Sequence, residues 1–237
     1  MTIAIPRFPA TNNEQDVYKV FNTILGYPAE IVPHYNHESL FDRKYSGVFI
    51  PGGFSFGDHL RAGAIAAVSE MVDVIKQKNK EENIPILGVC NGFQILTEAG
   101  MLPGVLLQNP STRFICKWVH LRVSSSSDSP ILKDIQGLVL SLPIAHYEGQ
   151  YNIPPEELQG EKNNMVLFQY CSREGCVDES FNPNGSVGNI AGVGDDINHI
   201  YGCMPHPERA SSPLLSSTDG LLILRNFIQI VKQVRSE

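Results

Sequence analysis

The segment Gly88-Val89-Cys90-Asn91-Gly92 carries the sharpest chemical signal in the sequence. It ends an apolar run over 84–89 and precedes a helix predicted over 93–99. This is the cysteine form of a nucleophile elbow, in which small residues two positions before and after the nucleophile permit a tight strand-to-helix turn. The helix N-terminus carries partial positive charge and so stabilises a thiolate. We therefore expect Cys90 to be a nucleophile, and the alternative is an ordinary buried cysteine.

A thiol nucleophile needs a proton acceptor and a group that orients this acceptor. The segment Met204-Pro205-His206-Pro207-Glu208 contains both residue types, directly after a strand predicted over 199–204. The prolines are expected to keep the backbone extended, so that the side chains of His206 and Glu208 project to one side. We expect a triad of Cys90, His206 and Glu208, and the alternative for the last two is a salt bridge on an exposed loop.

Acyl transfer also requires N–H donors for the oxyanion that forms on the substrate. The backbone amide of Asn91, directly after the nucleophile, is one candidate. The second candidate is the amide of Gly53 in the turn Pro51-Gly52-Gly53, which follows a strand predicted over 47–50. This turn has no side chain to block approach, although an ordinary strand exit would have the same composition.

The elements that must position these residues follow from the pattern of apolar residues. Short β-branched runs alternate with helix-period segments in the first hundred residues, which indicates βαβ units and a parallel sheet. Strands are expected at 2–6, 29–33, 47–50, 84–89, 114–123, 138–145, 165–170, 189–193 and 199–204, and helices near 17–25, 65–75, 93–99 and after Thr218 or Asp219. The expected fold class is α/β, with a mostly parallel central sheet flanked by helices, extra antiparallel strands and a single domain over 1–237.

The composition argues against several classes of partner. Eighteen basic and 25 acidic residues give a net charge of −7, and no basic run is present, so we expect no nucleic-acid or membrane partner. The most apolar uncharged stretch, 84–97, is shorter than the roughly 18 residues that a membrane-spanning helix needs. The N-terminal sequence lacks the pattern of a secretory signal, so we expect a cytoplasmic protein.

No cofactor of the chain's own is indicated. The five cysteines contain no C-x-x-C pair, and no histidine or carboxylate completes a zinc site around Cys171 and Cys176. The sequence has neither a Gly-Lys dipeptide, and hence no Walker loop, nor a G-x-G-x-x-G segment. We expect no metal on this chain, and any ATP must be bound by another protein.

The chain resembles the class I, triad-type glutamine amidotransferases in three segments, which occur in the same order along the sequence: 51–53, 88–94 and 206–208. More narrowly, the chain is similar to the family of glutaminase subunits of phosphoribosylformylglycinamidine synthase. The segments that carry this second resemblance are 54–66, 113–119, 143–146, 182–186 and 204–210. The resemblance covers nearly the whole chain.

The resemblance implies a flavodoxin-like fold and hydrolysis of L-glutamine to glutamate and ammonia. The ammonia would pass through a tunnel to an ATP-dependent synthetase subunit, which binds ATP and Mg²⁺ and converts formylglycinamide ribonucleotide to formylglycinamidine ribonucleotide in de novo purine biosynthesis. A small accessory third subunit would assist assembly. By matching position, Cys90 attacks the substrate amide, His206 transfers the proton and Glu208 orients the imidazole. Gly53 and Asn91 would hold the oxyanion, and Gln94 would contact the glutamine.

Two segments depart from the family pattern. A Phe-Pro-Gly-Ser-Asn-like turn appears here with Ala10 in place of glycine, and a His-Gly-Glu-Gly-Arg-Tyr run appears over 146–151 with Tyr147 and Gln150. We expect both segments to lie away from the triad and to affect pocket or partner contacts. Two alternative functions are a different triad amidotransferase or cysteine amidase that acts alone, and a catalytically silent scaffold.

Overall fold

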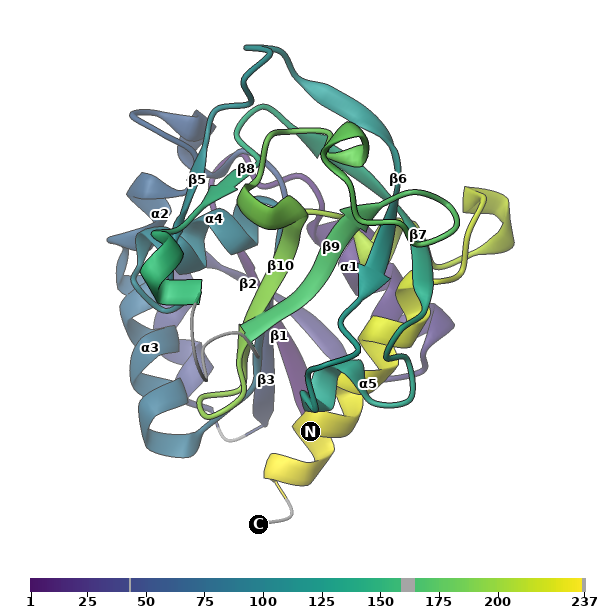
Figure 1. The fold of residues 1–237 in the computed structure, drawn as a ribbon. Coiled ribbons are helices and arrows are strands. Elements are labelled where there is room, and N and C mark those ends of the chain that lie inside the picture. Colours follow the sequence, from purple (N-terminus) through teal and green to yellow (C-terminus); the bar gives the residue numbers. More distant parts are fainter. Residues whose placement is uncertain (43, 159–164, 236–237) are drawn as a thin grey trace.

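A nine-stranded mixed sheet runs through the computed structural model, which describes residues 1–42, 44–158 and 165–235 (Figure 1). The strand order is β2-β1-β3-β4-β11-β10-β9-β6-β7. The strands are β1 (Thr2–Arg7), β2 (Ala29–Pro33), β3 (Tyr45–Ile50), β4 (Ile86–Val89), β6 (Ile115–Val123), β7 (Val139–His146), β9 (Val166–Cys171), β10 (Ile190–Asp195) and β11 (Ile200–Cys203). A separate antiparallel pair joins β5 (Val105–Leu107) to β8 (Gln150–Asn152), and the sequence pattern did not predict it.

The large sheet has two halves with different strand directions. All neighbours from β2 to β11 are parallel. All neighbours from β11 to β7 are antiparallel. The predicted α/β class, with parallel central strands flanked by helices and extended by antiparallel strands, is therefore confirmed.

Helices cover the parallel half of the sheet, with α3 and α4 on one side and α5 on the other in Figure 1. Their bounds are α1 (Glu14–Lys19), which continues as a π-helix over Val20–Ile24, α2 (Ala64–Ala67), α3 (Glu70–Glu82), α4 (Asn91–Glu98) and α5 (Gly220–Val234). Short 3-10 helices occupy His34–Phe41, Ser55–Asp58, Pro130–Leu132, Pro155–Leu158, Glu179–Phe181, Val187–Asn189, Pro207–Arg209 and Pro213–Leu215. No helix among the described residues is both long and apolar enough to cross a membrane.

The predicted helices differ in detail from the observed ones. The helix expected over 65–75 is divided into α2 and α3, because Ser69 has extended backbone angles and its hydroxyl donates to the carbonyl of Ala66. Helix α4 begins at Asn91, two residues earlier than expected, so it starts directly after Cys90.

Helix α5 shows how the core is closed. Its apolar residues Leu224, Phe227 and Val231 are fully buried, each contributing about 1.5–3 kcal/mol by burial. A side chain at Gly47 in β3 would place its Cβ 2.6 Å from a methyl group of Val231. The absence of a side chain at Gly47 therefore lets α5 approach the sheet closely.

The carboxyl ends of three adjacent parallel strands meet at one edge of this core. In the strand register, Ile50 of β3 is paired with Gly88 of β4, and Val89 of β4 with Cys203 of β11. The segments that follow these strands are the three that the sequence predicts to carry chemistry. Ligand sites of open α/β sheets form at such an edge.

Candidate active site

Cys90 lies at the apex of the turn from β4 into α4, with φ 52° and ψ −107°. This conformation is rare for a residue with a side chain and is maintained only by close packing around it. A Cβ at Gly88 would lie 2.6 Å from the carbonyl oxygen of Gly92, and a Cβ at Gly92 would lie 2.0 Å from that of Ile50. Both glycines are therefore required by the tight turn, as an elbow predicts.

His206 and Glu208 form a buried pair after β11. The imidazole Nδ1 lies 2.7 Å from Oε1 of Glu208, and the two residues are 1% and 2% exposed. They are not a salt bridge on an exposed loop. The expectation of an extended backbone through Glu208 was wrong: His206 is extended, but residues Pro207–Arg209 form a 3-10 turn, which begins at Pro207 because the fixed φ of proline suits that position.

Gly52 lies between the imidazole and the nucleophile. A Cβ at Gly52 would be 2.8 Å from Cε1 of His206 and 3.3 Å from Cβ of Cys90. Within the described part of the chain, Nε2 of His206 makes no hydrogen bond. The fold therefore brings the predicted base and nucleophile together around one small space.

The charges around His206 favour its protonated form. Burial alone lowers the pKa of this imidazole, but the negative charges of Glu208 and Cys90 outweigh the effect of burial and raise the pKa to about 10. The raised pKa of His206 favours the imidazolium, the form that pairs with a thiolate.

The oxyanion candidates lie on both sides of the nucleophile. Asn91 is the first residue of α4, so its backbone amide belongs to the first turn, where amides lack a helical acceptor. Gly53 has φ +137°, which favours glycine. The turn around Gly53 is tied to the elbow, because the amide of Ser55 donates to Oδ1 of Asn91 at 3.1 Å.

Gln94 lies on α4, one turn beyond Cys90, and is 4% exposed. Its Oε1 accepts a hydrogen bond from Nδ2 of Asn91 at 2.9 Å, and its Nε2 donates to the carbonyl of Glu148 at 2.5 Å. These bonds fix the Gln94 amide between the elbow and the turn that follows β7.

Two carboxylates near Asn91 were not singled out by sequence reasoning. Oδ1 of Asp58 lies 3.5 Å from Nδ2 of Asn91, and the carboxylate of Glu148 accepts a hydrogen bond from the amide of Ala62 at 3.0 Å. Burial and the negative charge of Glu148 raise the pKa of Asp58 to about 6. The sequence did contain a signal for them: Asp58 lies in a segment that carries the family resemblance, and Glu148 lies in a segment that departs from the family pattern.

Comparisons with known proteins show the family of the chain. The family defined by the CobB/CobQ-like glutamine amidotransferase domain matches residues 1–219. The chain belongs to this amidotransferase family. The phosphoribosylformylglycinamidine synthase subunit PurQ of Aquifex aeolicus is 48% identical over 227 residues, covering 94% of this chain and 97% of the relative. The subunit of the same name from Pyrococcus furiosus is 45% identical over 230 residues, covering 97% and 98%.

Solved structures extend the comparison of this amidotransferase to its fold. One chain in the structure of PurLQS from Thermotoga maritima has a TM-score of 0.80 and 34% identity, covering 96% of this chain and 97% of that one. A putative GMP synthase component from Thermoplasma acidophilum has a TM-score of 0.63 at 19% identity, which shows a shared fold alone.

The amidotransferase departs from its family pattern next to the site, contrary to our expectation. Ala10 has φ 64°, a left-handed conformation that a glycine adopts without cost, and its carbonyl accepts a hydrogen bond from the amide of Phe54 at 3.3 Å. The second segment begins after Ala145, whose carbonyl accepts a hydrogen bond from Sγ of Cys90 at 3.5 Å. Both segments return to the edge where β3 and β4 end, which spacing along the sequence does not reveal.

His146 is a further residue that the sequence analysis did not assign. It is 2% exposed, and burial together with the charge on His206 lowers its pKa to about 4. A Cβ at Gly149 would lie 2.1 Å from Cε1 of His146, so the ring is packed against this glycine. The amidotransferase therefore places a neutral imidazole beside a charged one.

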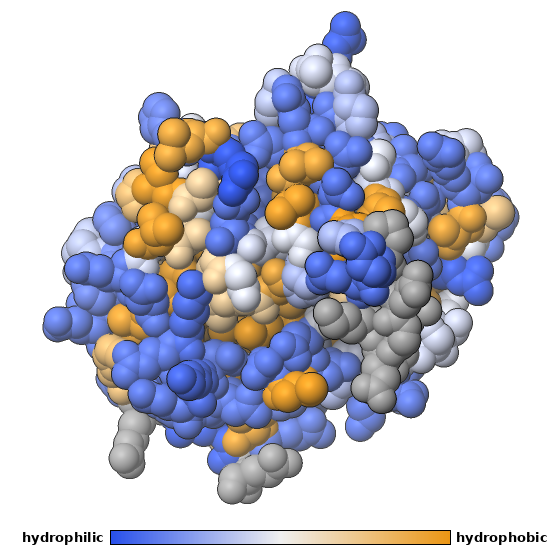
Figure 2. Space-filling view, turned by 60° about the vertical axis from the view of Figure 1, so that its left-hand side comes forward, coloured by the Kyte–Doolittle hydropathy of each residue, from blue (hydrophilic) through white to orange (hydrophobic). Residues whose placement is uncertain are grey.

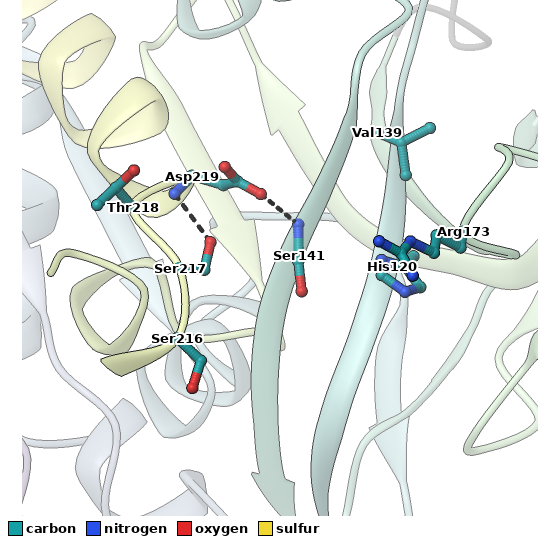
Figure 3. Close-up of a pocket in the computed structure, with 8 residues that line it drawn as sticks. All are labelled: His120, Val139, Ser141, Arg173, Ser216, Ser217, Thr218 and Asp219. Atoms are coloured by element: carbon teal, nitrogen blue, oxygen red, sulfur yellow. Dashed lines mark hydrogen bonds between the residues drawn. The ribbon is translucent and has the colours of Figure 1, made fainter. Parts of the chain in front are cut away.

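A cavity of about 660 Å³ lies elsewhere on the amidotransferase, between β6, β7 and the start of α5 (Figure 3). His120 and Arg173 line one side of it, and residues 216–219 line the other. The carboxylate of Asp219 connects the start of α5 to β7, because it accepts a hydrogen bond from the amide of Ser141 at 2.8 Å. The lining of this cavity includes no residue of the proposed triad.

No group of three or more potential metal ligands occurs among the residues that the structure describes. Cys171 is buried and Cys176 is exposed, and both are free thiols. The absence of a metal from the chain stays a prediction.

Proposed function

We propose that the chain is the glutaminase subunit of phosphoribosylformylglycinamidine synthase. It hydrolyses L-glutamine to glutamate and ammonia and supplies the ammonia to an ATP-dependent synthetase subunit, which converts formylglycinamide ribonucleotide to formylglycinamidine ribonucleotide in de novo purine biosynthesis. The observation that carries this proposal is the buried set of Cys90, His206 and Glu208 after adjacent strands, in a chain that matches PurQ subunits over nearly its full length.

In the proposed mechanism, the thiolate of Cys90 attacks the side-chain amide carbon of glutamine. The amides of Gly53 and Asn91 donate to the oxyanion of the tetrahedral intermediate. The imidazolium of His206 gives its proton to the departing nitrogen, so that ammonia leaves and a thioester remains. Neutral His206 then takes a proton from water, whose oxygen attacks the thioester, and the thiolate leaves as glutamate is released. Glu208 holds Nδ1 throughout.

Gln94 has a supporting role in this proposal. Its amide is fixed on α4 within one turn of the nucleophile, where it can contact the glutamine side chain as it enters. The half-buried carboxylate of Asp58 lies 3.5 Å from the Asn91 amide and is close enough to the carboxylate of Glu148 to be affected by its charge, so this side of the site is acidic.

The partners proposed are the synthetase subunit, which binds ATP and Mg²⁺, and a small third subunit. The similar chain from Thermotoga maritima belongs to a structure of PurLQS. Phe54 and Phe114 are 42% and 48% exposed, their rings are 6.4 Å apart, and Phe54 follows the proposed oxyanion turn. Apolar areas also interrupt the hydrophilic surface in Figure 2. Exposed aromatic residues beside the site fit a subunit that delivers its product to a docked partner.

We further propose that residues 1–237 form one amidotransferase domain without a bound cofactor. The proposed location is the cytoplasm, where a reducing environment keeps a thiol nucleophile such as Cys90 reduced.

The decisive experiment compares glutamine with ammonia as the nitrogen source for the assembled synthase. In Cys90→Ser and His206→Ala we expect glutamine-dependent synthesis to fall by more than about 1000-fold, because the attacking atom or its proton carrier is lost, while ammonia-dependent synthesis is retained. Cys176→Ser, which changes an exposed cysteine, is the control. Normal glutamine-dependent synthesis by Cys90→Ser would refute the proposal.

A second measurement separates the alternatives. The isolated chain should hydrolyse glutamine slowly and accelerate when the synthetase is added, whereas an amidase that acts alone would be fast by itself. A glutamine-like electrophile should label Cys90, whereas a silent scaffold would take up no label.

A further inference from the structure

Asn13 is a buried amide in contact with the proposed base. It is 3% exposed, and its Nδ2 lies 3.3 Å from Nδ1 of His206. A Cβ at Gly52 would lie 2.6 Å from the same Nδ2. The amide of Asn13, the imidazole of His206 and the backbone of Gly52 are therefore packed together without room for another group.

The orientation of the Asn13 amide is set by Arg209. Nη2 of Arg209 donates a hydrogen bond to Oδ1 of Asn13 at 2.5 Å, so the NH₂ group is the end that faces His206. Arg209 is itself held by Asp16, whose Oδ2 accepts from Nε at 3.3 Å. An amide turned the other way would place its NH₂ group against the guanidinium, which has no acceptor.

This orientation has a consequence for the ring. Nδ1 of His206 carries the proton that it donates to Glu208 at 2.7 Å, and therefore it cannot also accept from Asn13. The NH₂ group of Asn13 thus presents the positive end of its dipole to a ring that Glu208 and Cys90 hold in its charged form. Such a contact limits rotation of the imidazole ring and lowers the affinity of the ring for its proton.

We propose that Asn13 is a positioning residue for His206: Arg209 turns its amide so that the NH₂ group holds the imidazole in line between Glu208 and Cys90. The inference rests on the proposed triad. The other charged or titratable groups near the ring are His146, which is neutral, and Arg209 and Asp16, which act through Asn13. The contact opposes the charge on His206 and so helps the ring to release its proton to ammonia.

The same segment connects the base to the oxyanion turn. Thr11 forms an isolated bridge with Gly53, and a Cβ at Gly53 would lie 2.7 Å from the amide nitrogen of Asn12. Residues 10–13 therefore contact the Gly53 turn at one end and His206 at the other. A displaced Asn13 would disturb both proposed elements.

The test measures the pH dependence of two reactions in the assembled synthase: glutamine hydrolysis, and alkylation of Cys90 by iodoacetamide. Asn13→Asp keeps the shape of the side chain but replaces the NH₂ group by a carboxylate oxygen, so His206 should keep its proton to higher pH. We expect the alkaline limb of both profiles to move up by at least half a pH unit, and kcat to fall by roughly 10-fold. KM should change by less than twofold, because Asn13 lies behind the ring.

Asn13→Ala is the second variant, in case the new charge prevents folding, and should move the alkaline limb in the same direction by less. Asn79→Ala is the matched control, because Asn79 is also buried and bonded to two backbone carbonyls but lies far along α3; it should lower Tm and leave both profiles unchanged. Unchanged profiles in both Asn13 variants would overturn the inference. If the unsubstituted protein showed the alkylation profile but did not hydrolyse glutamine, this result would instead contradict the proposed function.

Discussion

The parallel and antiparallel halves of the sheet contribute to the site in different ways. The parallel strands β3, β4 and β11 are each followed, within three residues, by a group that takes part in the proposed chemistry. The antiparallel strand β7 supplies backbone instead: the carbonyl of Ala145 faces the thiol of Cys90, and that of Pro143 accepts from the amide of His206 at 2.9 Å. The parallel half therefore carries the reacting side chains, and the antiparallel half supplies carbonyl groups that contact Cys90 and the backbone of His206.

This difference predicts where the molecule tolerates change. Groups after the parallel strands are fixed by contacts between backbone atoms, which cannot move independently of the sheet. The turn after β7 is fixed by side-chain amides such as Asn109 and Asn184, which contact its backbone from other segments. Substitutions in the first region should abolish folding or chemistry, whereas substitutions in the second should mainly change substrate affinity.

The largest effect is expected for Gly92→Ala. The new Cβ would lie 2.0 Å from the carbonyl oxygen of Ile50, a backbone atom of the central strand β3. We expect a loss of about 3 kcal/mol or more in the free energy of unfolding, enough to leave little folded protein. Chemical denaturation and the yield of folded protein measure this effect.

Gly100→Ala is the control for Gly92→Ala, since Gly100 has φ +68° and a Cβ added there would meet no atom within 4 Å. Only the left-handed conformation should cost stability there, by about 1 kcal/mol. Equal losses in the two variants would show that the elbow is not tightly packed.

Glu208→Gln should reduce activity strongly without unfolding the chain. The neutral side chain keeps the size of the carboxylate but removes a negative charge that raises the pKa of His206, so this pKa should fall. The alkaline limb of the kcat/KM profile should therefore move to lower pH. The loss of kcat should be roughly 100-fold smaller than that of His206→Ala, because an orienting group contributes less than the group that transfers the proton.

Glu98→Gln is the matched control for Glu208→Gln. Glu98 is the last residue of α4; its side chain is 10% exposed and is paired with Arg61. If both variants moved the pH profile by the same amount, the result would contradict the role assigned to Glu208.

Asn184→Ala tests the antiparallel side. Nδ2 of Asn184 donates to the carbonyl of Gly149 at 2.7 Å, and its Oδ1 accepts from the buried amide of Ser186 at 3.2 Å. Loss of both bonds should cost about 1–3 kcal/mol. The turn that ends at Gly149 also carries the Glu148 carbonyl that holds Gln94, so KM for glutamine should rise several-fold while kcat stays within threefold. Steady-state kinetics distinguish the two parameters.

Asn189→Ala controls for the general cost of removing a buried amide. Asn189 donates to the carbonyls of Tyr170 and Asp178, and among the described residues it has no hydrogen bond to the turn after β7. It should lose comparable stability with an unchanged KM. A fall in kcat with unchanged KM in Asn184→Ala would contradict the division of roles between the two halves.

Asp58→Asn should produce the smallest effect. The folded pKa of Asp58, about 6, exceeds its ordinary value of 3.8, so the folded chain loses stability as pH rises through this range. Asparagine cannot ionise and tolerates the φ of 53° at this position. We expect the variant to be more stable at pH 8 by up to about 1 kcal/mol after allowance for solvent screening, with a smaller gain at pH 4.5.

Urea denaturation at the two pH values checks the Asp58 prediction, with Asp128→Asn at an exposed position as the control. A gain that is equal at pH 4.5 and pH 8 would show that ionisation of Asp58 does not oppose folding.

The sequence was informative where chemistry and fold depend on local spacing. The elbow glycines, the strands before Gly52, Cys90 and His206, and the apolar face of α5 all follow from short-range patterns. The predicted pairing of His206 with Glu208 is present although the backbone between them turns, because two residues so close in sequence can meet in either conformation.

Long-range contacts were not predictable in the same way. The positions of Asn13, Ala145 and Glu148 beside the site depend on how β6 and β7 join the sheet and how residues 8–13 return across it. Hydrophobic periodicity does not specify these pairings. The interpretation of the Ala10 segment as remote from the triad was wrong for this reason.

The loop after the oxyanion turn combines several unfavourable backbone conformations. Phe56, Asp58 and Leu60 all have positive φ, a conformation that costs about 1–2 kcal/mol for a residue such as Phe or Leu and less for Asp. This local cost lowers the free energy needed to open the loop without unfolding the sheet. We therefore expect amide hydrogens of 54–60 to exchange with solvent faster than those of β3, and gentle heating to inactivate the enzyme before its secondary structure melts.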